Sequence, residues 1–292
     1  MCGIFGVLGS FYNGIETLDL NLISHRGPDA QDLCDIKNNK VLLGHTRLSI
    51  IDINDRANQP MHSSCGRFAI IYNGEIFNYL KLKLDLEKTG VIFKTKSDTE
   101  VILNGFIKLG YKFFSKLNGM FAICIHDKIK NKTIILRDQK GIKPLYIKKK
   151  IDGIIFSSEI KPIITYQNEK TSFNEDVLVR HLAYNFSPGS KTLFKGINKL
   201  SPGTILTFYK NNSKINKIKF EKNLYFNNVN FKIIKEQLDE SLNLAIKNQT
   251  ISDAKLGCFL SGGLDSSTIV YYAQKNRPDI ETFCIRGEWE EK

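Results

Sequence analysis

The hydrophobic pattern of this chain changes character once, and that change constrains the fold more than any other feature of the sequence. Over residues 1–209, short apolar segments are separated by turn residues, which is typical of paired antiparallel strands. Residues 210–230 are rich in Asn and Lys and lose all periodicity, which indicates a linker. Residues 231–292 alternate helix and strand patterns. The sequence therefore predicts an α+β domain, a linker and an α/β domain.

The first domain is expected to be rich in sheet, with helices packed on the outside. Its predicted strands are alternating or wholly apolar, and they cover residues 3–8, 41–51, 68–73, 120–127, 133–138, 145–149, 154–158 and 204–209. Two helices are predicted over 78–88 and 99–109. In the second of these, Val101, Ile102, Phe106 and Leu109 share one face.

The second domain is expected to begin with an amphipathic helix over 231–249, whose apolar stripe is Ile234, Leu238, Leu242 and Ala245. It is followed by a strand over 255–260, a Gly- and Ser-rich loop, a helix over 267–275 and a strand over 280–286. That is one βαβ unit, the start of a doubly wound sheet. Such a sheet needs more strands than two, so the α/β domain is expected to be partial in this chain.

Composition excludes several classes of protein. With 42% hydrophobic and 25% charged residues, a chain of 292 residues is not dominated by disorder. Its six cysteines show no CxxC pairing, and neither a signal peptide nor an apolar run of about 18 residues occurs, so a soluble, cytoplasmic protein is expected. The net charge of +12 is spread over scattered lysines. Nucleic-acid binding is therefore only a distant alternative.

The first candidate site opens the chain. Removal of the initiator Met would leave Cys2 with a free α-amine. An α-amine titrates at about 7.7 to 8.0 and a thiol near 8.5, so this amine can take the thiol proton near neutral pH without a histidine. The alternative is that residue 2 is simply a cysteine.

Other blocks have ordinary structural explanations when each is taken alone. Asn73-Gly74 follows an apolar strand and is a strong hairpin signal. Ser97 with Glu100 forms a capping box, which would assign Asp98 to the dipole of the helix that follows. None of the five histidines has a metal-ligand spacing, so each is expected to be structural.

Taken together and in order, these blocks resemble the glutamine-hydrolysing domain of class II amidotransferases, the N-terminal nucleophile type, and most closely the asparagine synthetase family. The matching blocks are residues 1–4, 25–29, 44–52, 58–61, 73–78, 97–100, 117–122, 137–138 with 141–146, 156–161 and 199–203. The resemblance implies an Ntn-hydrolase αββα sandwich of two antiparallel sheets. It assigns 1–209 to the glutamine amidotransferase type 2 domain and 231–292 to a partial asparagine synthetase domain.

The resemblance also implies roles for individual residues. Cys2 would attack the carboxamide of glutamine, and Asn73 and Gly74 would form the oxyanion hole. Arg47 would hold the α-carboxylate with its bidentate guanidinium, and Asp98 with Glu75 would hold the α-ammonium. The implied glutamine-binding residues are Arg47, Leu48, Ile50, Ile51, Asn73, Gly74, Glu75 and Asp98.

The second candidate site lies between the strand and the helix of the α/β domain. Ser261-Gly262-Gly263-Leu264-Asp265-Ser266-Ser267 suits a phosphate, because paired glycines let the backbone approach an anion at a helix N-terminus. A flexible linker is the alternative, and a Walker A loop is excluded by its missing Lys. The segment resembles the pyrophosphate loop of ATP pyrophosphatases, which implies ATP, with Mg²⁺ held in part by Asp265. The implied ATP-binding residues are Leu260, Ser261, Gly262, Gly263, Leu264, Asp265, Ser266, Ser267 and Ile285.

The implied function is glutamine-dependent asparagine synthesis by a ligase that adenylates aspartate with ATP and amidates it with ammonia. No tightly bound metal is expected, and the partners would be a second copy of the chain or a separate chain that completes the synthetase domain. Two alternatives stay open. One is a glutaminase serving another acceptor, such as in surface-polysaccharide synthesis, and the other is a non-catalytic fragment of a split gene.

Overall fold

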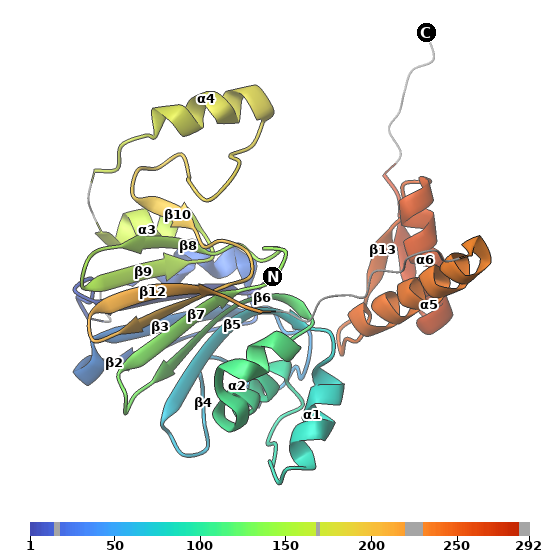
Figure 1. Cartoon of the computed structure of the whole chain (residues 1–292), viewed down its shortest axis with the longest axis horizontal. Coiled ribbons are helices and arrows are strands. Elements are labelled where there is room, and N and C mark those ends of the chain that lie inside the picture. The colour runs from blue at the N-terminus through green and yellow to red at the C-terminus, as the bar shows by residue number, and fades with distance from the viewer. Residues whose placement is uncertain (15–17, 168–169, 220–229, 286–292) are drawn as a thin grey trace. The chain divides into compact units, whose positions relative to one another are not determined.

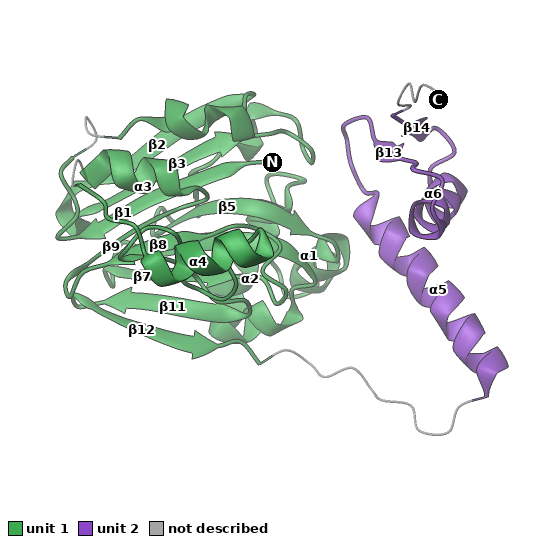
Figure 2. Cartoon of the chain, turned by 90° about the horizontal axis from the view of Figure 1, so that it is seen from above, with its two compact units in different colours: residues 1–221 green, residues 222–292 purple. Residues whose placement is uncertain are grey.

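The computed structural model describes residues 1–14, 18–167, 170–219 and 230–285 and divides the chain into two compact units, residues 1–221 and 222–292 (Figures 1 and 2). Among the described residues, no helix has both the length and the hydropathy needed to cross a bilayer.

The described residues of unit 1 form two six-stranded sheets in which the strands pair antiparallel. In spatial order, the first sheet consists of β10 (Ile197–Lys199), β8 (Tyr146–Lys149), β9 (Gly153–Ser157), β1 (Gly3–Gly9), β3 (Val41–Arg47) and β2 (Ala30–Ile36). The second sheet consists of β12 (Asn212–Lys217), β11 (Thr204–Tyr209), β7 (Lys132–Arg137), β6 (Gly119–Asp127), β5 (Phe68–Ile76) and β4 (Met61–His62).

The helices of unit 1 lie outside these sheets. The α-helices are α1 (Tyr79–Glu87), α2 (Asp98–Leu109), α3 (Ile160–Gln167) and α4 (Glu175–Tyr184), and the 3₁₀ segments are η2 (Leu20–Arg26), η3 (Lys37–Asn39), η4 (Asp55–Ala57) and η5 (Gly110–Lys116). Helix α2 packs on β5, whereas α3 packs on β9. The layers are therefore helix, sheet, sheet and helix, which confirms the expected αββα sandwich.

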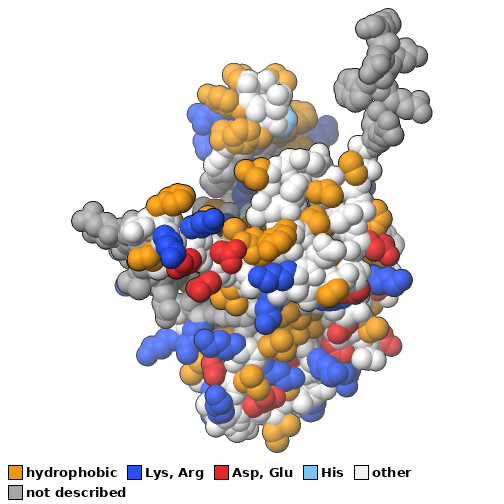
Figure 3. All heavy atoms as spheres, turned by 90° about the vertical axis from the view of Figure 1, so that its right-hand side faces the viewer, with side chains coloured by type: hydrophobic (Ala, Val, Ile, Leu, Met, Phe, Trp, Pro, Cys, Tyr) orange, Lys and Arg blue, Asp and Glu red, His pale blue; other side chains and the backbone are white. Residues whose placement is uncertain are grey.

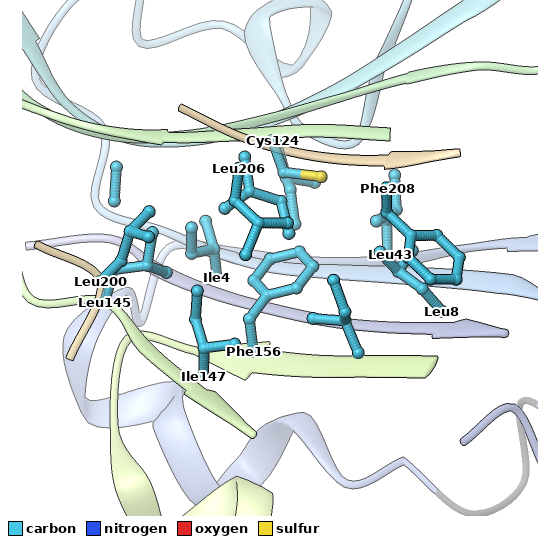
Figure 4. Packing of buried hydrophobic residues seen from close by; sticks show 14 of the residues in the cluster. Ile4, Leu8, Leu43, Cys124, Leu145, Ile147, Phe156, Leu200, Leu206 and Phe208 are labelled. Carbon is cyan, nitrogen blue, oxygen red and sulfur yellow. The ribbon is translucent and has the colours of Figure 1, made fainter. Parts of the chain in front are cut away.

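The main core lies between the two sheets. Ile4 of β1 and Phe156 of β9 point toward Leu206 of β11 and Cys124 of β6 (Figure 4). Strand β1 is buried on both faces, because the alternate residues Phe5 and Val7 pack under α3 and η2 in a second cluster. The backbone of the N-terminal strand is thus fixed directly after Cys2.

The structure corrects two predicted strand ends. The expected hairpin at Asn73-Gly74 is wrong: β5 runs on to Ile76, and Gly74 pairs with Phe121 in mid-strand. Here glycine serves close approach, since a Cβ at Gly74 would stand 2.2 Å from the carbonyl oxygen of Met120. The predicted strand 41–51 ends at Arg47, whose guanidinium donates hydrogen bonds to backbone carbonyls of the following loop.

The expected linker is also partly wrong. Residues 212–217 form β12, which pairs with β11 along its whole length, and the first unit extends to residue 221. Every residue of β12 is exposed, so no apolar alternation announces this edge strand in the sequence. The remainder of the predicted linker, residues 220–229, lies outside the described residues.

Unit 2 contains α5 (Phe231–Gln249), β13 (Gly257–Phe259), α6 (Leu264–Asn276) and β14 (Glu281–Phe283). Strands β13 and β14 pair parallel, so the βαβ prediction is confirmed. Helix α5 packs on α6, where Tyr272 donates a hydrogen bond to Asp239. The predicted apolar stripe of α5 is largely uncovered within this unit, with Leu238 57% exposed.

The charge and the cysteines follow the sequence expectation. On the face shown in Figure 3, lysine and arginine side chains are interspersed with carboxylates and form no single continuous patch. All six cysteines are free thiols.

Candidate active site

One pocket of unit 1 collects every residue that the sequence assigns to the glutaminase site. Its walls come from the N-terminus, the loop after β3, the C-terminal part of β5, the start of α2 and the loop after β7. The lining residues are Met1, Cys2, Arg47, Leu48, Ile50, Ile51, Ala57, Gln59, Tyr72, Asn73, Gly74, Glu75, Ser97, Asp98, Thr99 and Lys143.

Hydrogen bonds hold Cys2 at both its side chain and its backbone carbonyl. The Leu48 N–H donates to the Cys2 sulfur over 3.4 Å, and the Cys2 carbonyl accepts from Arg26 Nε at 3.1 Å. Arg26 is in turn anchored by Glu159 at 3.0 Å. Burial raises the pKa of the Cys2 thiol, while the Leu48 N–H and the nearby terminal amine lower it. The thiol therefore needs a base beside it to ionise near neutral pH.

Asn73 is the most unusual polar group of the pocket. Its side chain is 1% exposed, and neither its Oδ1 nor its Nδ2 has a hydrogen-bond partner among the described residues. A buried carboxamide without partners costs about 1–3 kcal/mol for each unsatisfied group. Such a group, aimed into a pocket that also holds a thiol, has the character of a preorganised oxyanion donor.

Arg47 is buried, and its hydrogen bonds stabilise the loop that follows β3. Its Nη1 donates to the Asn54 carbonyl at 2.9 Å and to Asn58 Oδ1 at 2.6 Å, while Nη2 donates to the carbonyls of Ile51 and Asp52. These four hydrogen bonds use both terminal nitrogens, so the expected bidentate grip on a carboxylate is not free in this structure. Nε–H remains as the donor without a partner among the described residues.

Asp98 and Glu75 bring negative charge to the pocket from two elements. Asp98 opens α2, and its Oδ2 accepts from the Tyr72 hydroxyl at 2.8 Å and from the Ile76 N–H at 3.1 Å. Burial raises the pKa of Asp98 above its ordinary value, while these hydrogen bonds act in the opposite direction. Burial also raises the pKa of Glu75, against the lowering effect of nearby Lys143.

The capping box predicted at Ser97 is half right. Ser97 Oγ accepts from the Thr99 N–H at 3.0 Å and caps α2. Glu100 instead accepts from the N–H groups of Lys94 and Thr95, so it closes the preceding loop and does not reach back to Ser97. A spacing of three residues does not distinguish these two partners.

Sequence reasoning missed four residues of this region. Tyr72 holds Asp98, Gln59 accepts from the Tyr72 N–H at 2.6 Å, Arg26 holds the Cys2 carbonyl, and Lys143 lines the pocket. Arg26 and Lys143 lie in blocks that carried the family resemblance, but nothing in the sequence told which way their side chains point.

The second predicted site lies in unit 2. Helix α6 begins at Leu264, three residues earlier than expected, so Asp265 and Ser266 occupy its first turn. Ser266 Oγ accepts from the Ser261 N–H at 3.3 Å and closes the loop. Gly262 has a φ of +81°, and a Cβ there would meet nothing within 4 Å, so the loop leaves room for a ligand.

The other predicted ATP contacts are open to solvent. Asp265 and Ser267 are exposed, and Ile285 is 92% exposed two residues after β14. Leu260 follows β13, and its N–H donates to the Phe283 carbonyl. No cluster of three or more metal-ligating side chains occurs among the described residues.

Two protein families match parts of the chain, one in each unit. Residues 1–220 match the family described as "Glutamine amidotransferase domain", and residues 237–291 match "Asparagine synthase". In structure, the chain is similar to glutamine phosphoribosylpyrophosphate amidotransferase from B. subtilis complexed with ADP and GMP. The TM-score is 0.55 and the identity 19%, over 99% of this chain and 67% of that chain. This likeness shows the fold.

Curated relatives are similar in sequence to this chain over nearly its whole length. A "Putative asparagine synthetase [glutamine-hydrolyzing] 2" of Methanocaldococcus jannaschii is 36% identical, covering 100% of this chain and 61% of that protein. "Asparagine synthetase [glutamine-hydrolyzing] 1" of Bacillus subtilis is 34% identical, covering 99% of this chain and 46% of that protein. The chain thus spans about half the length of the curated relatives that it matches. It belongs to the glutamine amidotransferase domain family, with an asparagine synthase segment after that domain.

Proposed function

We propose that unit 1 hydrolyses glutamine to glutamate and ammonia, with Cys2 as the nucleophile. The observation that carries the proposal is the buried, unpartnered carboxamide of Asn73 in the same pocket as the Cys2 thiol. An oxyanion formed beside Cys2 would accept a hydrogen bond from the Asn73 Nδ2–H, which has no other partner among the described residues.

The chemistry begins with the α-amine of Cys2, exposed once Met1 is removed. This amine takes the thiol proton, and the thiolate attacks the side-chain amide carbon of glutamine. Asn73 Nδ2–H and the Gly74 N–H stabilise the negative oxygen of the tetrahedral intermediate. The carbon–nitrogen bond then breaks, the amine returns its proton to the departing ammonia, and a γ-glutamyl thioester remains. Water hydrolyses the thioester, which releases glutamate and restores the thiol.

The two ends of the glutamine backbone meet opposite charges in the pocket. The carboxylates of Asp98 and Glu75 receive the α-ammonium group. Arg47 attracts the α-carboxylate through its remaining Nε–H and its charge, while its other N–H groups keep the loop around Leu48, Ile50 and Ile51 in shape.

For unit 2 we propose that the loop Ser261–Ser267 binds the phosphates of ATP. The open loop and the N-terminus of α6 fit a phosphate group, and the asparagine synthase family uses ATP. ATP activates a carboxylate for attack by ammonia, and Asp265 would share in holding Mg²⁺ that arrives with the nucleotide. The proposed whole reaction is amidation of aspartate to asparagine, carried out by two copies of the chain or with a further chain. The free cysteines support a reducing compartment, the cytoplasm.

Glutamate release from glutamine, without ATP or aspartate, tests the glutaminase. Wild-type protein whose Met1 removal is confirmed by mass should release glutamate, and the Cys2→Ala variant should not. Cys65→Ala is the matched control, because Cys65 is an exposed free thiol that does not line the pocket, and it should keep full activity. Absence of release by the folded, trimmed wild-type chain would refute the proposal.

A further inference from the structure

The segment that follows β7 is built around two charged side chains that the proposed reaction does not use. Arg137 donates three hydrogen bonds of 2.7 Å each to backbone carbonyls, from Nε to Lys143, from Nη1 to Leu200 and from Nη2 to Gly141. One guanidinium thus fixes both ends of the loop 141–143 and ties the loop to the segment before β11.

Asp138 fixes the same loop from inside. Its carboxylate is fully buried and accepts from the N–H groups of Lys140 and Ile142 on Oδ1, and of Lys143 and Phe121 on Oδ2, at 2.9 to 3.2 Å. The Phe121 contact matters, because Phe121 of β6 pairs with Gly74 of β5. Through Phe121, Asp138 therefore fixes the position of the loop relative to β5, the strand that carries Asn73, Gly74 and Glu75.

This scaffold delivers the Lys143 side chain into the glutaminase pocket. Lys143 is 4% exposed and lines the same pocket as Cys2 and Glu75. Its ammonium group has no hydrogen bond or ion pair within 4 Å among the described residues. Burial of an ammonium group costs several kcal/mol unless an opposite charge lies near it. We therefore expect the Lys143 ammonium, which a rigidly held loop buries in the pocket, to have a function there.

The charges around Lys143 indicate that role. The charged and titratable groups that interact electrostatically with it are Glu75 from β5, Cys2 from the N-terminus, Arg26 from η2 and Asp138 from its own loop, and of these Glu75 and Cys2 line the same pocket. Glu75 interacts with it most strongly and is partly buried, whereas Asp138 is already saturated with N–H donors. Glu75 in turn interacts electrostatically with Lys143, Asp98 and the N-terminal amine, and Lys143, Asp98 and Met1 line the pocket with it.

We propose that Lys143 is a positioning residue of the glutaminase site, whose ammonium balances the charge of Glu75 so that Glu75 stays ionised to receive the α-ammonium group of glutamine. The inference rests on the proposed glutaminase function. Without Lys143, burial and the nearby Asp98 charge would both favour protonated Glu75, with only the N-terminal amine opposing them. A protonated Glu75 has no negative charge to bind the α-ammonium group, so loss of Lys143 should weaken the binding of glutamine.

Glutamine binding to the Cys2→Ala protein tests the inference separately from catalysis. The Kd is measured by calorimetry between pH 5.5 and 8, with and without Lys143→Met. We expect the Lys143→Met change to weaken binding roughly tenfold at pH 6, with a smaller difference at pH 8, because one pKa unit corresponds to a tenfold change in the ionised fraction. In the Cys2-containing enzyme, KM should follow the same profile while kcat changes little.

Three further variants separate this role from a structural one. Lys143→Arg keeps a cation and should restore the wild-type pH profile. Lys140→Met removes an exposed lysine of the same loop and should change nothing. In a Glu75→Gln background, Lys143→Met should have no further effect on the pH profile, since the group it acts through is gone. Should Lys143→Met fold poorly, the Lys143→Gln and Lys143→Arg pair provides the same comparison.

The outcomes are distinct. A pH-independent loss of affinity, or an unchanged Kd, would overturn the inference while leaving the glutaminase intact. A fall in kcat with slower alkylation of Cys2 and an unchanged KM would assign the ammonium to the thiol and also overturn it. An inactive wild-type enzyme that still binds glutamine in the expected pH pattern would refute the proposed reaction but support the Lys143 inference.

Discussion

Replacing Asn73 with leucine should stabilise this protein and inactivate it at the same time. Leucine resembles asparagine in shape but has no polar side-chain atoms. Asn73 is 1% exposed and its carboxamide lacks partners among the described residues, so leucine relieves a cost of about 1–3 kcal/mol. For a domain of 150–250 residues, each kcal/mol raises Tm by about 2–4 °C.

The same substitution removes an oxyanion donor. Loss of one such donor typically lowers kcat by about 10²- to 10³-fold. Asn39→Leu is the matched control, since the Asn39 carboxamide donates to the Lys128 carbonyl at 2.9 Å and contacts His126. That variant should lose stability and keep its activity, because Asn39 does not line the pocket.

Scanning calorimetry of the full chain and glutamate release measure the two effects. Calorimetry suits unit 1 better than tryptophan fluorescence, because the single tryptophan, Trp289, lies in unit 2. A lowered Tm for Asn73→Leu would refute the reasoning about unsatisfied groups. Full activity in that variant would refute the oxyanion assignment.

Three more outcomes follow from the geometry. Gly74→Ala should lower Tm by overpacking, at a cost of about 1–3 kcal/mol, because its Cβ would stand 2.2 Å from the Met120 carbonyl oxygen; calorimetry checks this. As the pH is lowered, KM for glutamine should begin to rise at a pH above the ordinary pKa of a carboxylate, because burial raises the pKa of Asp98 and Glu75. Initial rates measured between pH 4.5 and 8 check this. Burial lowers the pKa of His45 from 6.5 to about 3, so its contribution to stability is present above pH 6.5 and is lost as pH falls toward 3. In urea titrations below pH 6, the free energy of unfolding of His45→Gln should depend less steeply on pH than that of the wild type. The difference in slope should correspond to about one fewer proton bound on unfolding.

The sandwich itself could be predicted from the sequence. Alternating and wholly apolar segments predicted most of its strands, and the matching blocks implied how the sheets stack. Helices α3 and α4 are not predicted from the sequence, although each buries at least one apolar side chain, and β12 is missed because the pattern there carries no hydrophobic signal. Strand β12 is exposed along its whole length and contains Lys214 and Lys217, which is typical of an edge strand that avoids further pairing. Its pairing with β11 decides its conformation, and no local periodicity reports that.

The sequence predicts many of the residues that line the pocket, but it does not predict how their side chains are held. Arg47 was expected to grip a substrate with both terminal nitrogens, and those nitrogens instead hold the loop 51–58. Lys143 lies in a block whose function the sequence did not reveal. Both misses have one cause, because the direction of a long polar side chain depends on contacts from distant elements.

The remaining failure of local rules indicates where function lies. Asn73-Gly74 reads as a turn, yet the chain continues through it as a strand. Among the described residues, the buried polar atoms without partners are Oδ1 and Nδ2 of Asn73, Nη2 of Arg26, Oδ2 of Asp35, Nδ1 of His45 and Nε2 of Gln167. Of these residues only Asn73 lines the pocket, and it is the one with both polar side-chain atoms unpartnered, although native proteins satisfy nearly all such groups. The core between the two sheets supplies enough stability to offset this cost. The Asn73 Nδ2–H donor is then available to bind a negative charge that exists only during the reaction.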